Sequence, residues 1–138
     1  MSPIPKQSGL SFTTLSVDDS GGVARDIRND ITSVSWATPR GVQDVTGIDK
    51  AAFERLLLTA DGTIQLNGVF NPDANMSHSV FKTVPSTSVQ RTVSIGIGGI
   101  TLAMEMLFSD YQVSRADSGE LTWQVSGVLA NGSVPTYA

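Results

Sequence analysis

Cysteine is absent from this chain of 138 residues, and His78 is its single histidine. A disulfide framework and a thiolate metal site are therefore both excluded. Charged residues make up 16% of the sequence, which is low against the ~25% of typical soluble domains. Basic residues number 9 against 13 acidic ones, so the chain lacks the excess of Lys and Arg that is typical of nucleic-acid-binding domains. No apolar run approaches the ~20 residues that a membrane span requires.

The sequence also offers little for catalysis. His78 is the sole candidate for a histidine base, and we expect it to be a surface or loop-packing side chain. The acidic turns at 18–19 and 71–73 fit turn chemistry better than calcium binding. Gly96–Gly99 lacks the spacing of a phosphate-binding loop. The sequence thus predicts no enzyme, no cofactor and no metal. A glycoside hydrolase stays open because sequence does not give carboxylate separations, although no pair stands out.

What remains is a composition rich in Ser, Thr, Gly and Val, which favours strands and turns. The length suits a single domain, residues 1–138. Residues 1–9 contain Pro3 and Pro5 and are expected to form an extended N-terminal arm, not a signal peptide. Terminal disorder and a role in assembly are both open for this arm. Further strands are expected near residues 10–17, 31–36, 63–70 and 121–125.

One clear helix is predicted over about 49–61. Asp49 is its candidate N-cap, and Gly62 follows as a candidate C′ residue. The apolar residues of the segment repeat at helical spacing: Phe53, Leu56, Leu57 and Ala60. A helix of this length is unstable alone and must dock on a sheet. A weaker helix is expected at 77–84, and residues 38–46 are expected to form a loop.

A long β-hairpin is predicted over about 88–110. Gly98 and Gly99 supply its two-residue turn, since both positions tolerate positive φ. The turn sets a register in which apolar meets apolar at four pairs: Ile97 with Ile100, Ile95 with Leu102, Val93 with Met104, and Val89 with Phe108. On the other face Gln90 meets Leu107. A one-residue slip would destroy this agreement.

The strand after the turn runs to about Arg115, and its alternation changes phase near Ser109. A bulge there reconciles the two halves. One strand is therefore expected to bend and to serve two pairings. Because it is long against a mean of ~5–6 residues, we expect it to run from the domain core into a shared structure.

Polar side chains gather on one face of this hairpin: Gln90, Thr92, Ser94, Thr101 and Glu105. The last strand carries a similar row of Glu120, Thr122, Gln124 and Ser126. Either face can be an ordinary solvated sheet surface. The functional hypothesis for the hairpin face is a polar channel wall, with Arg91 assigned to the opposite face.

The order and spacing of several segments resemble the major tail (tail tube) proteins of long-tailed bacteriophages. The segments are Gly21–Val23 with Asp26–Ile27, Asp44–Gly47, Gly68–Asn71, Phe108–Arg115, Gly119–Val125 and Asn131–Pro135. The resemblance runs from about Leu10 to the C-terminus. It implies a mainly β (α+β) fold: an antiparallel β-sandwich flanked by one helix, with the long hairpin joining an inter-subunit barrel.

The resemblance further implies a structural virion protein that forms stacked hexameric rings, through which double-stranded DNA leaves the capsid without specific binding. The protein would be made in the host cytoplasm and would reside in the virion tail. Its expected partners are copies of itself and the tape-measure, tail terminator and tail tip proteins. It is not expected to bind a membrane. The expected inter-ring contacts are Pro39, Arg40, Gly41, Val42 and Gln43. The alternatives are a tube subunit of a contractile tail or related injection system, or a carbohydrate-binding decoration module.

Overall fold

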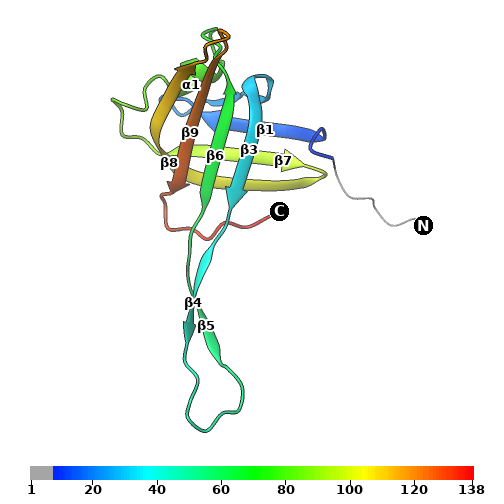
Figure 1. Cartoon of the computed structure of the whole chain (residues 1–138), viewed down its shortest axis with the longest axis vertical. Coiled ribbons are helices and arrows are strands. Elements are labelled where there is room, and N and C mark those ends of the chain that lie inside the picture. The colour runs from blue at the N-terminus through cyan, green and yellow to red at the C-terminus, as the bar shows by residue number, and fades with distance from the viewer. Residues whose placement is uncertain (1–7) are drawn as a thin grey trace, which may run out of the picture.

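The computed structural model describes residues 8–138 and shows a β-sandwich from which one long hairpin projects (Figure 1). The arm predicted over residues 1–9 lies outside the described residues except for its last two. In chain order the elements are β1 (Phe12–Asp18), β2 (Ala24–Asp26), η1 (Arg28–Asp30), β3 (Ile31–Ala37), β4 (Arg40–Asp44), β5 (Arg55–Ala60), β6 (Thr63–Val69), α1 (Ser77–Phe81), β7 (Arg91–Ile97), β8 (Ile100–Arg115) and β9 (Leu121–Leu129). The predicted antiparallel sandwich is confirmed.

The β7–β8 hairpin forms with the predicted turn and register. Gly98 and Gly99 have φ values of 60° and 83°, a region that glycine reaches without strain. Ile97 pairs with Ile100, and the ladder continues until Arg91 lies opposite Met106. The two pairs predicted beyond Arg91, those of Gln90 and Val89, are not part of this ladder, because β7 begins at Arg91.

The long strand β8 serves two pairings, as the sequence predicts. Its first part pairs with β7 up to Met106, and its second part pairs with β9 from Met106 to Arg115. The register shifts between Ser109 and Gln112, and Asp110 in that interval has a φ of 59°. This bulge bends the strand. The sheet therefore folds over on itself, with β3, β6 and β9 running crosswise to β1 and β7 in Figure 1.

The core lies between the two layers of this folded sheet, whose seven strands follow the order β2-β1-β7-β8-β9-β6-β3. Apolar side chains from both layers are buried there: Leu15, Val17, Ile27, Ile64, Leu66, Val80, Phe81, Val93, Ile95, Leu102, Met104, Met106, Trp123 and Val125. Burying one large side chain of this kind contributes about 1.5–3 kcal/mol. The core thus stabilises the sandwich, while one small helix, α1, closes its side.

The helix predicted over 49–61 is wrong. Arg55–Ala60 is instead strand β5, which pairs with β4, and the expected loop at 38–46 contains that partner strand. The reason is the missing docking surface. A helix of about eleven residues needs a sheet to pack on, whereas this segment extends away from the sandwich (Figure 1). The helix that does form, Ser77–Phe81, lies within the weaker prediction at 77–84.

The long hairpin was expected to join an inter-subunit barrel, which requires edges free for other copies, but its edges are closed within the chain. Strand β7 pairs on its outer side with β1, from Phe12 to Val17. The outer edge of the first part of β8 is covered by the C-terminal segment, since Leu102 bridges to Tyr137 and Thr101 exchanges two backbone hydrogen bonds with Ala138. The hairpin is an internal part of the sandwich.

Candidate assembly surfaces

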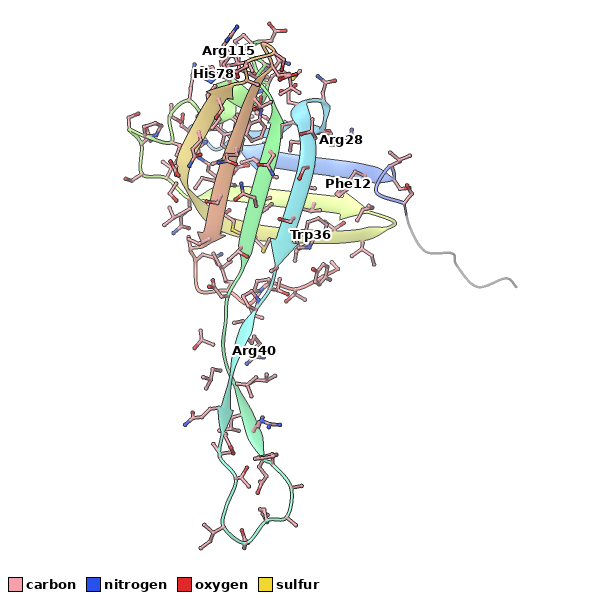
Figure 2. The ribbon with its side chains drawn as sticks, viewed as in Figure 1. Phe12, Arg28, Trp36, Arg40, His78 and Arg115 are labelled. Carbon is pink, nitrogen blue, oxygen red and sulfur yellow. The ribbon has the colours of Figure 1, made fainter. Side chains whose placement is uncertain are left out.

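The projecting β4–β5 hairpin comprises residues 40–60. It is called the arm below and is distinct from the N-terminal arm predicted from the sequence. Every residue of β4 is exposed, and so is every residue of β5 except Ala60. Figure 2 shows its side chains standing out on both sides of the ribbon with no other segment against them. Four of the five residues predicted as inter-ring contacts, Arg40–Gln43, lie in β4, and Pro39 precedes it. The arm stays together through its ladder and through Arg40 Nε, which donates to the Leu58 carbonyl at 2.8 Å.

The residues predicted as a channel wall lie largely together. Thr92, Ser94, Thr101 and Glu105 share the outer face of β7–β8, because Thr92 is opposite Glu105 and Gly96 is opposite Thr101. The Thr92 hydroxyl donates to the Glu105 carboxylate. Gln90 precedes β7 and lies outside the ladder. Nothing in this arrangement alone separates a channel wall from a solvated face, so the luminal assignment stays a prediction.

A second polar face is broader. It covers the outer side of β3, β6, β9 and the second part of β8, where directly opposed residues share a face. Its polar members are Ser33, Ser35, Thr63, Gln65, Asn67, Ser109, Gln112, Ser114, Thr122, Gln124 and Ser126. None of them carries a charge. The sequence signalled only the β9 row, because the pairing of β3 with β6 joins residues that are ~30 positions apart.

The two outermost strands of this four-strand layer have free edges. β3 is the last strand in the sheet order, and within residues 8–138 its outer edge has no ladder partner. The second part of β8 has left β7, so its other edge is also unpaired in the described chain. Because each pairing between the two is antiparallel, β3 and β8 run in opposite directions. Unpaired edges of this length are a template for pairing with another chain.

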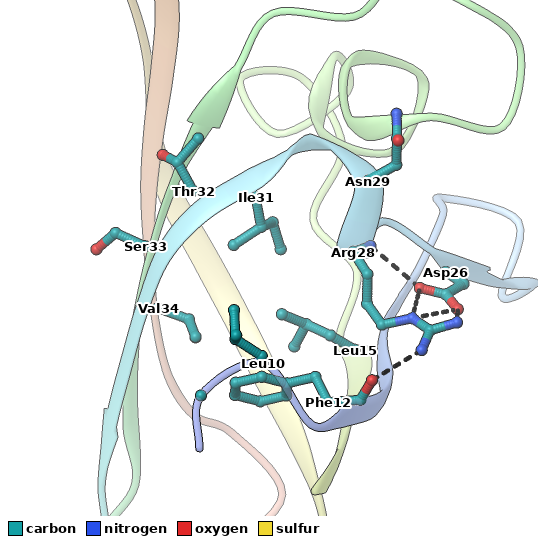
Figure 3. Close-up of a pocket in the computed structure, with 11 residues that line it drawn as sticks. Leu10, Phe12, Leu15, Asp26, Arg28, Asn29, Ile31, Thr32, Ser33 and Val34 are labelled. Atoms are coloured by element: carbon teal, nitrogen blue, oxygen red, sulfur yellow. Dashed lines mark hydrogen bonds and ion pairs between the residues drawn. The ribbon is translucent and has the colours of Figure 1, made fainter.

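A groove of ≈ 610 Å³ opens beside β3, between that strand and the start of β1 (Figure 3). Apolar side chains line it: Leu10, Phe12, Leu15, Ile31 and Val34. At its rim Arg28 is paired with Asp26 at 2.9 Å, and Arg28 also donates to the Phe12 carbonyl at 3.0 Å. The rim charges are thus satisfied by each other. The groove exposes polar as well as apolar atoms, because Asn29, Thr32 and Ser33 line it too.

His78 is a packing residue, as expected. Its ring lies against Phe70, with centroids 4.7 Å apart, and its Nδ1 is 3.1 Å from the Tyr111 hydroxyl. Burial raises the pKa of Tyr111 to about 12, so the phenol stays neutral. In residues 8–138 no three His, Cys, Asp or Glu side chains gather as metal ligands, and no helix is long and apolar enough to cross a membrane.

Asp30 is a buried carboxylate that ties η1 to α1. It accepts hydrogen bonds from the Ser77 backbone N–H at 2.9 Å and from the amides of Asn71 and Asn29. Burial by itself raises the pKa of Asp30, but these hydrogen bonds outweigh burial and lower the pKa below 3.8. The unfolded chain therefore takes up this proton first as the pH falls.

We expect the free energy of unfolding to fall as the pH drops below about 4, through the folded-state pKa of Asp30. Asp30→Asn should cost about 1–3 kcal/mol at neutral pH, because a buried acceptor is lost, and should flatten the acid dependence. Urea unfolding of the unassembled chain at pH 7 and pH 3 measures both. Asp117→Asn, in an exposed turn, is the control. An acid dependence of Asp30→Asn equal to that of the parent chain would contradict the assignment.

Comparison with known proteins identifies the fold. Neither the protein-family models nor the curated proteins contain a match to this sequence. Among solved structures, a chain in the tail of an empty gene transfer agent particle with C6 symmetry superposes with a TM-score of 0.72 at 15% identity, covering 96% of this chain and 99% of that one. A chain in the virion of a native gene transfer agent particle gives 0.70 at 14% identity, with the same coverage. The two matches show a fold shared over nearly the whole length of both chains.

Proposed function

We propose that this chain is the repeating subunit of a virion tail tube, a passive conduit through which double-stranded DNA leaves the particle. The observation that carries the proposal is the fold match over 96% of the chain to a subunit of a C6-symmetric tail. Copies would close into hexameric rings, and the rings would stack. Tape-measure, terminator and tip proteins are the other partners that such a tube would need. The role requires no catalytic residue.

The free edges support ring closure. The outer edge of β3 in one copy would meet the second part of β8 in the next, and the two run in opposite directions. The four-strand layers of all copies would then join into one continuous antiparallel barrel, which has no unpaired edge. A barrel of so many strands leaves an open lumen. Edge closure therefore favours the β3–β6–β9–β8 layer as the channel wall.

The outer face of this layer suits passage of DNA. A duplex carries one negative charge per ~1.7 Å of its axis, so a wall of lysines would hold it through many phosphate contacts. The hydroxyl and amide side chains of this face carry no positive charge, so they form no ion pairs with the phosphates. The hairpin face with Glu105, predicted from the sequence, is the competing wall. In that wall, the Glu105 carboxylate of every copy in the ring would face the channel.

Electron microscopy of the purified chain tests the proposal directly. We expect rings or hollow tubes with an axial lumen. A monodisperse monomer that binds glycans would overturn the tube proposal and favour the decoration module. The arm is the element that would reach the adjacent ring, through residues 39–43. Deletion of the arm is expected to leave rings but no tubes.

A paired substitution decides between the two candidate walls. Gln124→Lys places one cation per copy on the β9 face and should slow genome release from particles severalfold while tubes still form, because lysines contact phosphates. Glu105→Lys should leave release unchanged. Release kinetics measured by dye binding to ejected DNA read this out. The reverse result, slow release only with Glu105→Lys, would assign the channel wall to the hairpin face.

A further inference from the structure

Two of the five asparagines in the chain precede glycine, Asn67 before Gly68 and Asn131 before Gly132. An asparagine loses its amide when the backbone nitrogen of the next residue attacks the side-chain carbonyl carbon and closes a succinimide ring. Glycine hinders this attack least, because it carries no side chain. The two steps have the same local chemistry, so only their surroundings in the fold distinguish them.

The step from Asn131 to Gly132 lies in the bend after β9, where both residues are exposed. A Cβ built on Gly132 would meet nothing within 4 Å, so there is room for the ring to form. No backbone carbonyl of residues 8–138 accepts a hydrogen bond from the Gly132 N–H. The nitrogen that must attack is therefore not held by secondary structure.

The bend also orients the group that is attacked. The Oδ1 atom of Asn131 accepts a hydrogen bond from the Ser133 N–H at 3.0 Å. When the nitrogen adds to Cγ, negative charge develops on this oxygen, and a donor that already points at the oxygen stabilises that charge. The bend thus supplies both the nucleophile and a donor for the oxyanion.

The step from Asn67 to Gly68 is held in the middle of a sheet layer instead. Gly68 is paired with Ile31 on one side and with Trp123 on the other. A Cβ on Gly68 would overlap the Asp30 carbonyl, so this peptide has no room to rotate. Attack by the Gly68 nitrogen would require β6 to separate from its neighbours, and a strand paired on both sides opens rarely.

We propose that Asn131 is a site of spontaneous deamidation, at which the folded chain converts asparagine to aspartate and isoaspartate. The Gly132 nitrogen gives up its proton to solvent base and bonds to Asn131 Cγ. The bond from Cγ to Nδ2 then breaks, and ammonia leaves with a proton taken from solvent. One water molecule hydrolyses the succinimide at either of its two carbonyls. Each product carries a carboxylate at neutral pH, so the chain becomes one unit more negative than its formal −4.

The new charge has a defined place in the molecule. Val128 pairs with Thr63, at the start of β6, so the bend after β9 lies at the end of the sandwich from which the arm leaves (Figure 1). Isoaspartate also adds one carbon to the main chain between β9 and the C-terminal residues that close the edge of β8. Loss of ammonia is not reversed in water, so converted copies accumulate with age.

Peptide mass spectrometry of the unassembled chain, incubated in mildly alkaline buffer, measures both steps in one sample. We expect Asn131 to gain the mass of deamidation at least about tenfold faster than Asn67, because Asn67 reacts only after local opening of the sheet. In urea that unfolds the chain, the two rates should converge. Equal rates in the folded chain, or no reaction at Asn131 until urea is added, would overturn the proposal.

Variants test the chemistry at this step. Asn131→Gln lengthens the side chain by one carbon, so ring closure is slower and the mass gain should disappear on the same timescale. An undiminished mass gain would place the reaction at another residue. Ser133→Pro removes the donor N–H and should slow the reaction severalfold, whereas Ser133→Ala keeps the N–H and should match the parent. Equal rates for these two variants would refute the role of the Ser133 N–H. All of these measurements use unassembled chains, so their failure leaves the proposed tube intact.

Discussion

Replacement of Gly68 by alanine is expected to destabilise the fold strongly. A Cβ at this position would lie far inside van der Waals contact with the backbone carbonyl of Asp30, and 2.8 Å from the Trp123 ring. Neither obstacle can move easily, since the carbonyl is backbone and the ring is buried, with its Nε1 donating to the Val69 carbonyl at 2.9 Å. Overpacking of this kind costs about 1–3 kcal/mol and occasionally more, and a backbone clash belongs at the upper end.

Urea unfolding and the soluble yield of the chain measure this effect. Gly9→Ala is the matched control, because a Cβ there has nothing within 4 Å, and its midpoint should equal that of the parent chain. Surface substitutions usually change the free energy of unfolding by less than about 0.5 kcal/mol. A change this small for Gly68→Ala would refute the close packing of η1 on β6.

Replacement of Arg91 by methionine is the second change with a large expected effect. The Arg91 side chain is buried in the core, and its guanidinium donates to the Asp18 carbonyl at 3.0 Å, the Val80 carbonyl at 2.9 Å and the Thr83 hydroxyl at 2.9 Å. Burial lowers the pKa of Arg91, and the nearby charges of Asp19 and Asp18 oppose that shift. One side chain thus joins β1, α1 and the segment after α1 to β7.

Methionine keeps much of the apolar stem but donates no hydrogen bond, so three acceptors lose their partner. Each buried polar group left unsatisfied costs about 1–3 kcal/mol, and we expect a total loss of about 3 kcal/mol or more in the urea-derived free energy of unfolding. Arg91→Lys retains the charge but not the planar fork, and should fall between methionine and the parent. Equal free energies of unfolding for all three chains would refute the role of Arg91 in linking these elements to β7.

The β7–β8 hairpin could be predicted because its determinants are adjacent in the chain. Two glycines at positive φ set the turn, and alternation up to Arg91 sets which side chains face the core. The same alternation revealed the bend near Ser109, since an extra residue is visible as a change of phase. Arg91 was placed on the core face in this way, although its partners across the fold were not foreseeable.

The arm could not be predicted, because two patterns coexist in its sequence. Phe53, Leu56, Leu57 and Ala60 fit a helical stripe, while the run from Leu56 to Leu58 also fits a strand covered on both faces. Local spacing cannot choose between them. The choice depends on whether a surface lies beneath the segment, and in this fold none does.

The sequence by itself determined the β-rich class, the glycine turn, the register that follows from it and the side of the β7–β8 hairpin that faces the core. These follow from neighbours in the chain and from a period of two residues. Only the tertiary structure decided that the β7–β8 edges are closed, that the edges of β3 and of the second part of β8 are unpaired within residues 8–138, and that a groove lies beside β3. Those features depend on which distant strands become neighbours, and burial of the whole core, not any local pattern, selects that arrangement.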